Sequence, residues 1–116
     1  MSDHIVYISR NHMEVLNLQT GVVANGTAEF TSIRILIGNY PVAEKLLAEL
    51  MKATKSKSLF ARASRLIIQP MEMTEGGLCL IEQRAFEQLG ARAGALAARV
   101  HVGQKLTQDA AVALLR

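Results

Sequence analysis

Length, composition and charge indicate one small folded domain. The chain has 116 residues, of which 50% are hydrophobic and 20% are charged, so a disordered chain is excluded. The net charge of +3 is compatible with weak attraction to nucleic acid or anionic lipid and requires neither. A single cysteine, Cys79, excludes an internal disulfide and favours a reducing compartment. We expect one domain over residues 1–116, located in the cytoplasm, because the sequence has no transmembrane run and no signal-peptide core.

The first predicted elements are two antiparallel strands. Ile5–Ile8 and Met13–Leu18 are short apolar runs of the kind that forms strands. The four polar residues between them, 9–12, predict a tight turn. A connection this short joins neighbouring strands in antiparallel orientation, so the sequence predicts a hairpin.

A third strand is predicted to begin at Val22 and to be interrupted soon afterwards. Asn25-Gly26 is the residue pair typical of a type I′ turn, so we expect a bend or a small extra hairpin there. The strand is then predicted to resume over Phe30–Ile37. Its isoleucines alternate along the chain and would share one face of the sheet. They are Ile33, Ile35 and Ile37.

Residues 40–70 predict a helix, a basic linker and a buried strand. Asn39 is a suitable N-cap, and Pro41 falls in the first turn, where its missing N–H has no cost. Arg65–Pro70 is a short apolar run closed by proline, which is typical of an interior strand covered on both faces. The apolar residues of the helix recur at the spacing of one helical face. They are Val42, Leu46, Leu47, Leu50 and Met51.

The last third predicts two more helices and a fifth strand. Thr74 is the expected cap of the second helix, and Gly90 is the expected C′ residue just after its end. Residues 91–98 are rich in small side chains and could form a loop or a loose helix. Arg99–Val102 is predicted to be a strand, and Thr107 is predicted to cap a final helix. The second helix has its apolar residues at helical spacing, namely Leu78, Ile81, Ala85, Phe86 and Leu89.

The predicted order is β-β-β-α-β-α-β-α. Three antiparallel strands followed by two right-handed crossovers give one five-stranded mixed sheet with helices packed on it. The fold class is therefore α/β, in a single domain.

Five stretches of the sequence resemble the first core subdomain of MreB, the bacterial rod-shape actin. They are Ile33-Arg34, Tyr40–Leu47, Arg65–Pro70, Glu82–Ala95 and Arg99–Val102. The resemblance implies a ribonuclease H-like half-domain of the actin superfamily. It covers nearly the whole chain, but the second domain of the family has no counterpart in this sequence.

The residues that bind nucleotide in the actin family are not matched. The family holds phosphate with an Asp-x-Gly-Thr turn, and Ile8-Ser9-Arg10-Asn11 stands there, without the Asp that would organise Mg²⁺ or the Gly that lets the backbone approach phosphate. Gly103-Gln104-Lys105 stands where the family has Glu-Glu-Pro. The first strand also offers no carboxylate for a two-metal nuclease site. We expect no nucleotide, no other cofactor, no metal and no catalytic residues.

Isolated histidines and the cysteine give no catalytic pattern. His4 and His12 are expected on the surface, and His101 is expected in a strand with a local partner, since no pair has zinc-ligand spacing. Cys79 lies among leucine and isoleucine residues and has no Cys-His motif around it, so we expect a buried structural thiol.

A basic cluster follows the first predicted helix and is the candidate contact site for an anion or a protein partner. The same charges are also what a solvated helix end and linker would carry. Phe60 is the single aromatic residue nearby, so base stacking is unsupported and a nucleic acid partner is not expected. The cluster consists of Lys52, Lys55, Lys57, Arg62 and Arg65.

The sequence therefore favours a non-catalytic, MreB/actin-like protein-interaction module. The resemblance suggests a cytoskeletal or cell-shape partner. Alanine and leucine residues over 91–98 and 110–115 favour self-association, and we expect a homodimer. The alternative is a small regulatory α/β module that binds a ligand or nucleic acid through the basic linker; it predicts salt-dependent binding that is lost when Lys52, Lys55 and Lys57 become Glu. A third hypothesis, an enzyme, would require a convergent polar pocket around His101 or Cys79.

Overall fold

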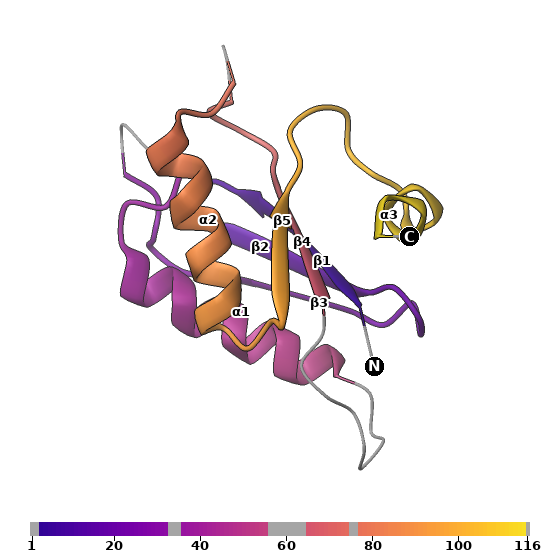
Figure 1. Cartoon of the computed structure of the whole chain (residues 1–116). Coiled ribbons are helices and arrows are strands. Elements are labelled where there is room, and N and C mark those ends of the chain that lie inside the picture. The colour runs from indigo at the N-terminus through magenta and orange to yellow at the C-terminus, as the bar shows by residue number, and fades with distance from the viewer. Residues whose placement is uncertain (1–2, 33–35, 56–64, 75–76, 116) are drawn as a thin grey trace.

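A computed structural model describes residues 3–32, 36–55, 65–74 and 77–115. In these ranges the chain forms a five-stranded sheet and three helices, in the predicted order (Figure 1). The elements are β1 (His4–Ser9), β2 (His12–Asn17), β3 (Val23–Thr27), α1 (Tyr40–Thr54), β4 (Arg65–Pro70), α2 (Leu80–Arg92), β5 (Ala97–Val100) and α3 (Gln108–Leu115). The prediction of a small α/β domain with one mixed sheet is confirmed.

The sheet order is β3-β2-β1-β4-β5. The pairs β1–β2 and β2–β3 are antiparallel, whereas β1–β4 and β4–β5 are parallel. The antiparallel pairs follow from the short turns, and the parallel pairs follow from the helical crossovers α1 and α2. β1 is therefore the central strand, with Val6 beside Val15 of β2 and Ile68 of β4.

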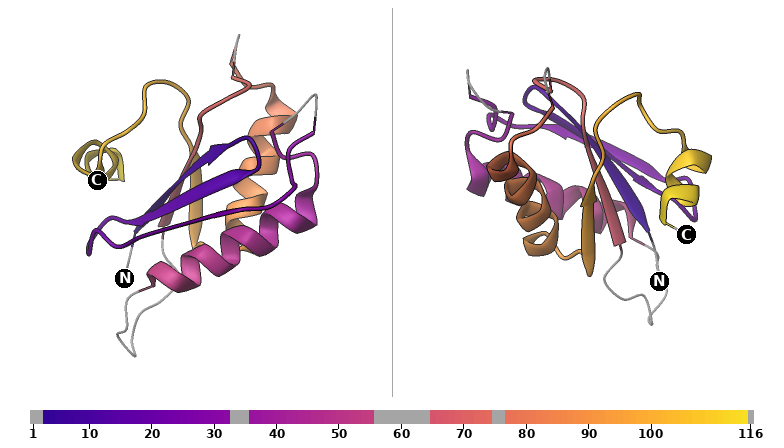
Figure 2. Two further views of the ribbon diagram at one scale, coloured as in Figure 1. Left: turned by 180° about the vertical axis from the view of Figure 1, so that it is seen from behind. Right: turned by 45° about the horizontal axis from the view of Figure 1, so that its top comes forward.

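Helices cover both faces of the sheet. α1 and α2 lie on one face and α3 lies on the other, as the right-hand view of Figure 2 shows. Val6 and Ile8 of β1 belong to the core under α1 and α2, while Ile5 and Tyr7 belong to the core under α3. The central strands are buried on both sides, which explains why β1 and β4 are nearly continuous apolar runs.

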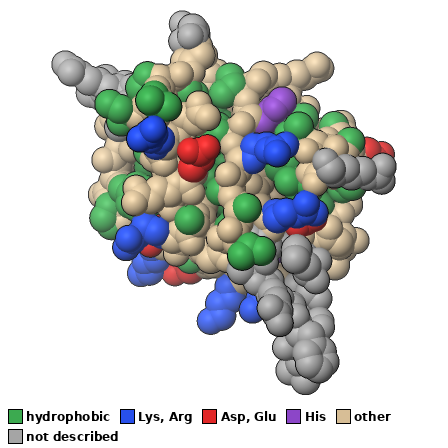
Figure 3. Space-filling model, in the orientation of Figure 1, with side chains coloured by type: hydrophobic (Ala, Val, Ile, Leu, Met, Phe, Trp, Pro, Cys, Tyr) green, Lys and Arg blue, Asp and Glu red, His purple; other side chains and the backbone are tan. Residues whose placement is uncertain are grey.

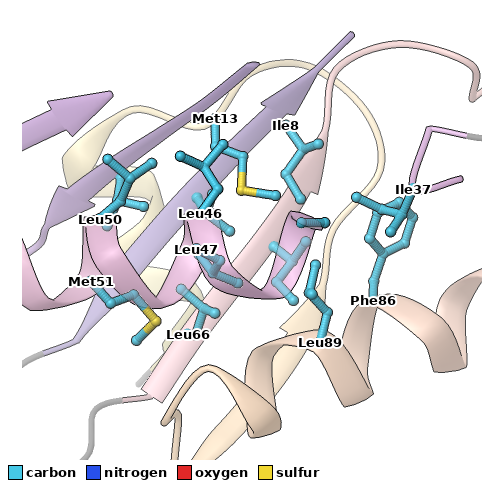
Figure 4. Close-up of a cluster of buried hydrophobic side chains, with 14 of the residues drawn as sticks. Ile8, Met13, Ile37, Leu46, Leu47, Leu50, Met51, Leu66, Phe86 and Leu89 are labelled. Carbon is cyan, nitrogen blue, oxygen red and sulfur yellow. The ribbon is translucent and has the colours of Figure 1, made fainter. Parts of the chain in front are cut away.

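The larger core lies between α1, α2 and the sheet (Figure 4). The predicted apolar face of α1 is confirmed, since Leu47 is fully buried and Leu46, Leu50 and Met51 are at most 9% exposed. Asn39 caps α1 as expected, because its Oδ1 accepts from the Val42 N–H at 3.4 Å. Burial of each such side chain stabilises the fold by roughly 1.5–3 kcal/mol, so this core dominates the stability of the domain.

The predicted bend at Asn25-Gly26 is wrong, because both residues lie within β3. Gly26 passes directly beneath α1, and a Cβ there would lie 3.0 Å from Cδ1 of Leu46. The glycine lets a helix pack closely on an edge strand and does not form a turn.

The prediction that this strand resumes over Phe30–Ile37 is also wrong for the described residues of that stretch. The Phe30 carbonyl accepts from the N–H groups of both Gly38 and Asn39, at 2.7 Å each, so the chain folds back on itself before α1. Ile37 is buried, while Ile33 and Ile35 lie outside the described residues.

Helix α2 begins five residues later than predicted and continues past Gly90 to Arg92. Thr74 does not cap it; Cys79 occupies the N-cap position, and its N–H donates to Oε1 of Glu82 at 3.4 Å. Gly77 has a φ of +85°, which a helix cannot accommodate. Gly90 lies inside the helix, where an added Cβ would be 2.8 Å from Cβ of Ala98, so this glycine lets α2 approach β5.

The C-terminal elements are close to their predicted positions. β5 spans Ala97–Val100, two residues before the expected Arg99–Val102, and the stretch 91–98 holds the end of α2 and the start of β5. Thr107 caps α3 as predicted, since its Oγ1 accepts from the Ala110 N–H at 3.1 Å. None of the described helices is long and apolar enough to cross a membrane.

Candidate functional site

An apolar groove lies between the first turns of α2 and the segment that leads into α1. Its volume is about 210 Å³. Phe86 and Ile37 lie against each other on its inner side (Figure 4). Apart from one carboxylate, the lining is uncharged, so the groove suits an apolar group. The lining residues are Leu36, Ile37, Cys79, Ile81, Glu82, Ala85 and Phe86.

Two neighbouring large apolar side chains are exposed at the start of α2, and one of them, Ile81, lines this groove. Ile81 is 80% exposed and Leu80 is 63% exposed. The helical spacing predicted Ile81 on the buried face of α2, which is wrong. The first turn of α2 lies beside Leu36 and Ile37 and not over the sheet. Ile81 therefore borders the groove, although its spacing places it on the same helical face as the buried residues of α2. Figure 3 shows hydrophobic side chains gathered on the surface at this end of the molecule.

Cys79 is exposed, contrary to the prediction of a buried thiol. It was expected inside a helix capped by Thr74, where its neighbours would have faced the core. Because α2 begins at Leu80, Cys79 lies at the N-cap and contributes to the groove wall. The groove beside the thiol has one ionisable carboxylate, Glu82, whose Oε1 already accepts from the Cys79 N–H.

The turn between β1 and β2, where the resemblance places the phosphate-binding turn, is occupied by side chains of the chain itself. The Arg10 N–H donates to the Glu72 carboxylate at 2.5 Å. The Asn11 N–H donates to Oγ1 of Thr31 at 2.9 Å, and the Thr31 N–H donates back to Oδ1 of Asn11 at 2.8 Å. The Glu72 carboxylate already accepts from the Arg10 N–H, and its negative charge would repel an anion that approached this turn.

Three of the five residues of the predicted basic cluster lie in the described part of the chain, namely Lys52, Lys55 and Arg65. Arg65 is held by Asp3, through Nε at 3.1 Å and Nη2 at 2.8 Å, and its Nη1 donates to the Leu115 carbonyl at 2.8 Å. Lys52 and Lys55 are exposed at the end of α1. Lys57 and Arg62 lie outside the described residues. Arg65 therefore acts as an internal tie between β4 and both chain ends.

The ion pair with Arg65 changes the pKa of the Asp3 carboxyl group. Burial by itself would raise its pKa, but the hydrogen bonds and charge of Arg65 outweigh burial and lower the pKa below 3.8. Asp3 is therefore ionised at neutral pH and holds the guanidinium of Arg65. Its side chain is 10% exposed, against 42% for Arg65.

His4 is buried, contrary to the prediction that it lies on the surface. It is 2% exposed, and burial lowers its pKa below 6.5, although a hydrogen bond with the Thr54 backbone and the charge of Asp3 act the other way. Nδ2 of Asn17 also donates to the Thr54 carbonyl, at 2.8 Å. The end of α1 is thus fastened to β1 and β2 by buried polar side chains.

The other histidines do not assemble a site. His12 is half-buried at the start of β2. His101 follows β5 and is not in a strand, and its N–H donates to the Ile68 carbonyl at 3.0 Å. Within the described ranges, no group of three His, Cys, Asp or Glu residues could hold a metal ion.

A buried glutamine, which the sequence analysis did not single out, fixes the loop before α3. Gln69 is fully buried; its Nε2 donates to the carbonyls of Gly103 and Gln104, and its Oε1 accepts from the Leu106 N–H. The Tyr7 hydroxyl donates to the Leu106 carbonyl at 2.7 Å. A polar residue inside an otherwise apolar strand was the available sign of this role.

Fold and groove together define the class of this protein: a small α/β domain with one mixed sheet and an open apolar groove at the start of α2. No protein-family model matches the chain. It is 32% identical to the uncharacterized protein YjaA of Escherichia coli (strain K12), over an alignment of 120 residues that covers 97% of this chain and 94% of that protein. The chain belongs to the family of YjaA.

Proposed function

We propose that this chain is a non-catalytic protein-interaction module of ribonuclease H-like, actin-type architecture, and that it binds a partner protein through the α2 groove. The observation that carries the proposal is the open apolar groove with Ile81 and Leu80 exposed beside it. Exposed apolar surface of this kind is costly in water unless a partner covers it.

The strand order supports the architecture. An order of β3-β2-β1-β4-β5, with three antiparallel strands and two parallel crossovers, is what the resemblance to the first MreB subdomain implies. The resemblance also makes a bacterial cell-shape protein the first partner to test.

The β1–β2 turn supports the loss of nucleotide binding. The Glu72 carboxylate occupies the Arg10 N–H and brings negative charge to the place where phosphate would lie in an actin-like protein. Calorimetric titration with ATP-Mg²⁺ tests this part, and we expect no heat of binding. Binding at micromolar concentration would overturn it and would make nucleotide central to the function.

The dimensions of the groove suit one bulky apolar side chain of a partner. An apolar cavity of about 150 Å³ holds a benzene-sized group, and this groove is larger, at about 210 Å³. Burial of one large apolar side chain contributes roughly 1.5–3 kcal/mol. A partner segment that also covers Ile81 and Leu80 would gain comparable amounts from each.

The test is a binding comparison with two tryptophan variants. Ala85→Trp fills the groove, whereas Gln88→Trp adds the same side chain to the exposed face of α2 outside it. Partners captured from a bacterial lysate by wild-type protein are purified and titrated by calorimetry. We expect at least one partner that Gln88→Trp binds with unchanged affinity and that Ala85→Trp binds at least tenfold more weakly. If every partner binds both variants equally, the groove is not the site.

A further inference from the structure

Strand β3 forms one edge of the sheet and lacks the residues that usually protect such an edge. Natural edge strands usually carry charges, prolines or bulges that prevent pairing with another chain. Residues 15–28, which include all of β3, contain no charged residue and no proline. The opposite edge differs, because Arg99 lies in the middle of β5 and its Nη1 donates to the Leu114 carbonyl at 2.9 Å.

The backbone groups of β3 alternate between β2 and the free edge. The Val22 carbonyl accepts from Asn17 and the Ala28 N–H donates to Asn11, so the even-numbered residues of this stretch bond to β2. The odd-numbered residues then point their N–H and C=O groups outward. Across the described ranges, no backbone or side-chain group bonds to them. They are Val23, Asn25 and Thr27.

We propose that the occupant of this edge is β3 of a second copy of the chain. A two-fold axis through Asn25, perpendicular to the sheet, pairs Asn25 with its own copy and Val23 with Thr27 of the other copy. Each of these three pairs exchanges two backbone hydrogen bonds, so every outward group is satisfied. All side chains brought opposite one another are neutral, and the result is one continuous sheet across the dimer.

The position of α1 fits the same axis. α1 packs against β2 and β3 alike (Figure 2, left view). The side-chain ends of Leu46 and Leu50 lie over Gly26. Strands lie about 4.8 Å apart, so an axis at the β3 edge sets the two α1 helices about 10 Å apart. Helices pack at roughly 8–10 Å, so the two copies of α1 meet without a gap or an overlap.

Charges on α1 are complementary across this axis. An axis beside Leu46 and Leu50 runs the two helices antiparallel and brings Lys45 of one copy next to Glu49 of the other, twice in the dimer. Both side chains are exposed, and neither forms an ion pair with a described residue of its own chain. The inference does not depend on the α2 groove, which lies on another part of the molecule and stays open in this dimer.

The first test is molar mass by sedimentation velocity. We expect twice 12.6 kDa for wild-type protein at tens of micromolar. Asn25→Lys places two positive charges on the axis and should return the mass to that of one chain, with an unchanged circular dichroism spectrum, because Asn25 is exposed. The matched control, Gln88→Lys, should remain dimeric. A monomeric wild-type protein, or a dimeric Asn25→Lys variant, overturns the proposal.

Cross-linking tests the register directly, in a Cys79→Ser background. Paired residues on the axis have Cα atoms about 5.5 Å apart, within the range of a disulfide, so Asn25→Cys should form a covalent dimer under mild oxidation. Val22→Cys is the control, because its two copies would lie about 20 Å apart. Equal cross-linking of both variants would contradict the register.

Charge reversal tests the α1 contact. Lys45→Glu should weaken the dimer by about tenfold, since it replaces two attractions by repulsions. Adding Glu49→Lys to it should restore the wild-type affinity, because the pair is reversed and not removed. A double variant as weak as the single variant would show that these residues do not meet.

Discussion

The two ends of the sheet are built in opposite ways. At the end where β1 and β4 begin, the buried polar side chains of Asp3, His4 and Asn17 are tied to α1, to Arg65 and to neighbouring backbone groups. At the end where α2 begins, the surface is apolar and a groove stands open beside Ile81. The closed end stabilises the fold, and the open end holds the groove through which we propose that a partner binds. Substitutions at the two ends should therefore separate stability from function.

The largest effect is expected at Asn17, which is fully buried at the closed end. Its Oδ1 accepts from the N–H groups of Gln19 and Thr20, and its Nδ2 donates to Thr54. Asn17→Ala leaves these groups without a partner and should lower the free energy of unfolding by about 3 kcal/mol. Urea denaturation measures the change. Gln83→Ala, on the exposed face of α2, is the control and should change it by less than about 0.5 kcal/mol.

A smaller loss is expected from a substitution between the two ends, at Gly90. An added Cβ would lie 2.8 Å from Cβ of Ala98 and 3.1 Å from Cδ1 of Ile68. Gly90→Ala should therefore destabilise the domain by about 1.5 kcal/mol, since overpacking exceeds the gain in helix propensity. The same denaturation experiment measures it. An increase in stability would mean that α2 and β5 separate easily.

The free energy of unfolding should depend on pH because His4 is buried at the closed end. Its pKa in the folded protein is lowered, first by burial, so the unfolded chain takes up a proton more readily. The stability that His4 contributes is fully present above pH 6.5 and is lost as the pH falls through its folded pKa. Asp3, which faces His4, keeps its contribution until the pH falls below 3.8. Unfolding free energies at pH 7.5 and 5 should differ less in His4→Gln than in the wild type.

The smallest effect on stability is expected at the open end. Ile81→Glu changes a side chain that is 80% exposed, so the free energy of unfolding should change by less than about 0.5 kcal/mol. The same variant should lose any partner that binds the groove, because a carboxylate would have to be buried there. A large loss of stability would show that Ile81 belongs to the core, and the contrast between the ends would fail.

The sequence predicted the elements whose causes are local. β1, β2, β4 and α1 were predicted from their apolar patterns, and the caps at Asn39 and Thr107 were predicted from their own side chains. β3 was mispredicted because the reason for Gly26 is a helix that lies more than a dozen residues further along the chain.

The candidate site could not be predicted from the sequence, because it too depends on contacts between residues that are far apart along the chain. The groove depends on where α2 starts, and because α2 starts five residues later than predicted, Cys79 is exposed and not in the core. Ile81 has the spacing of the buried face of α2, but spacing alone does not show whether the first turn of α2 packs on the sheet. Burial of His4 depends on the end of α1, which reaches it from fifty residues away.

The guanidinium of Arg65 also brings together two parts of the chain that are far apart in the sequence. Arg65 holds both the Asp3 carboxylate and the Leu115 carbonyl, so residues 3 and 115 lie close together. A short linker could therefore join them, and a circular permutant should retain the same sheet. Two fluorophores attached beside residues 3 and 115 would be held close together in the folded state and would separate on unfolding, which makes energy transfer between them a direct readout of folding.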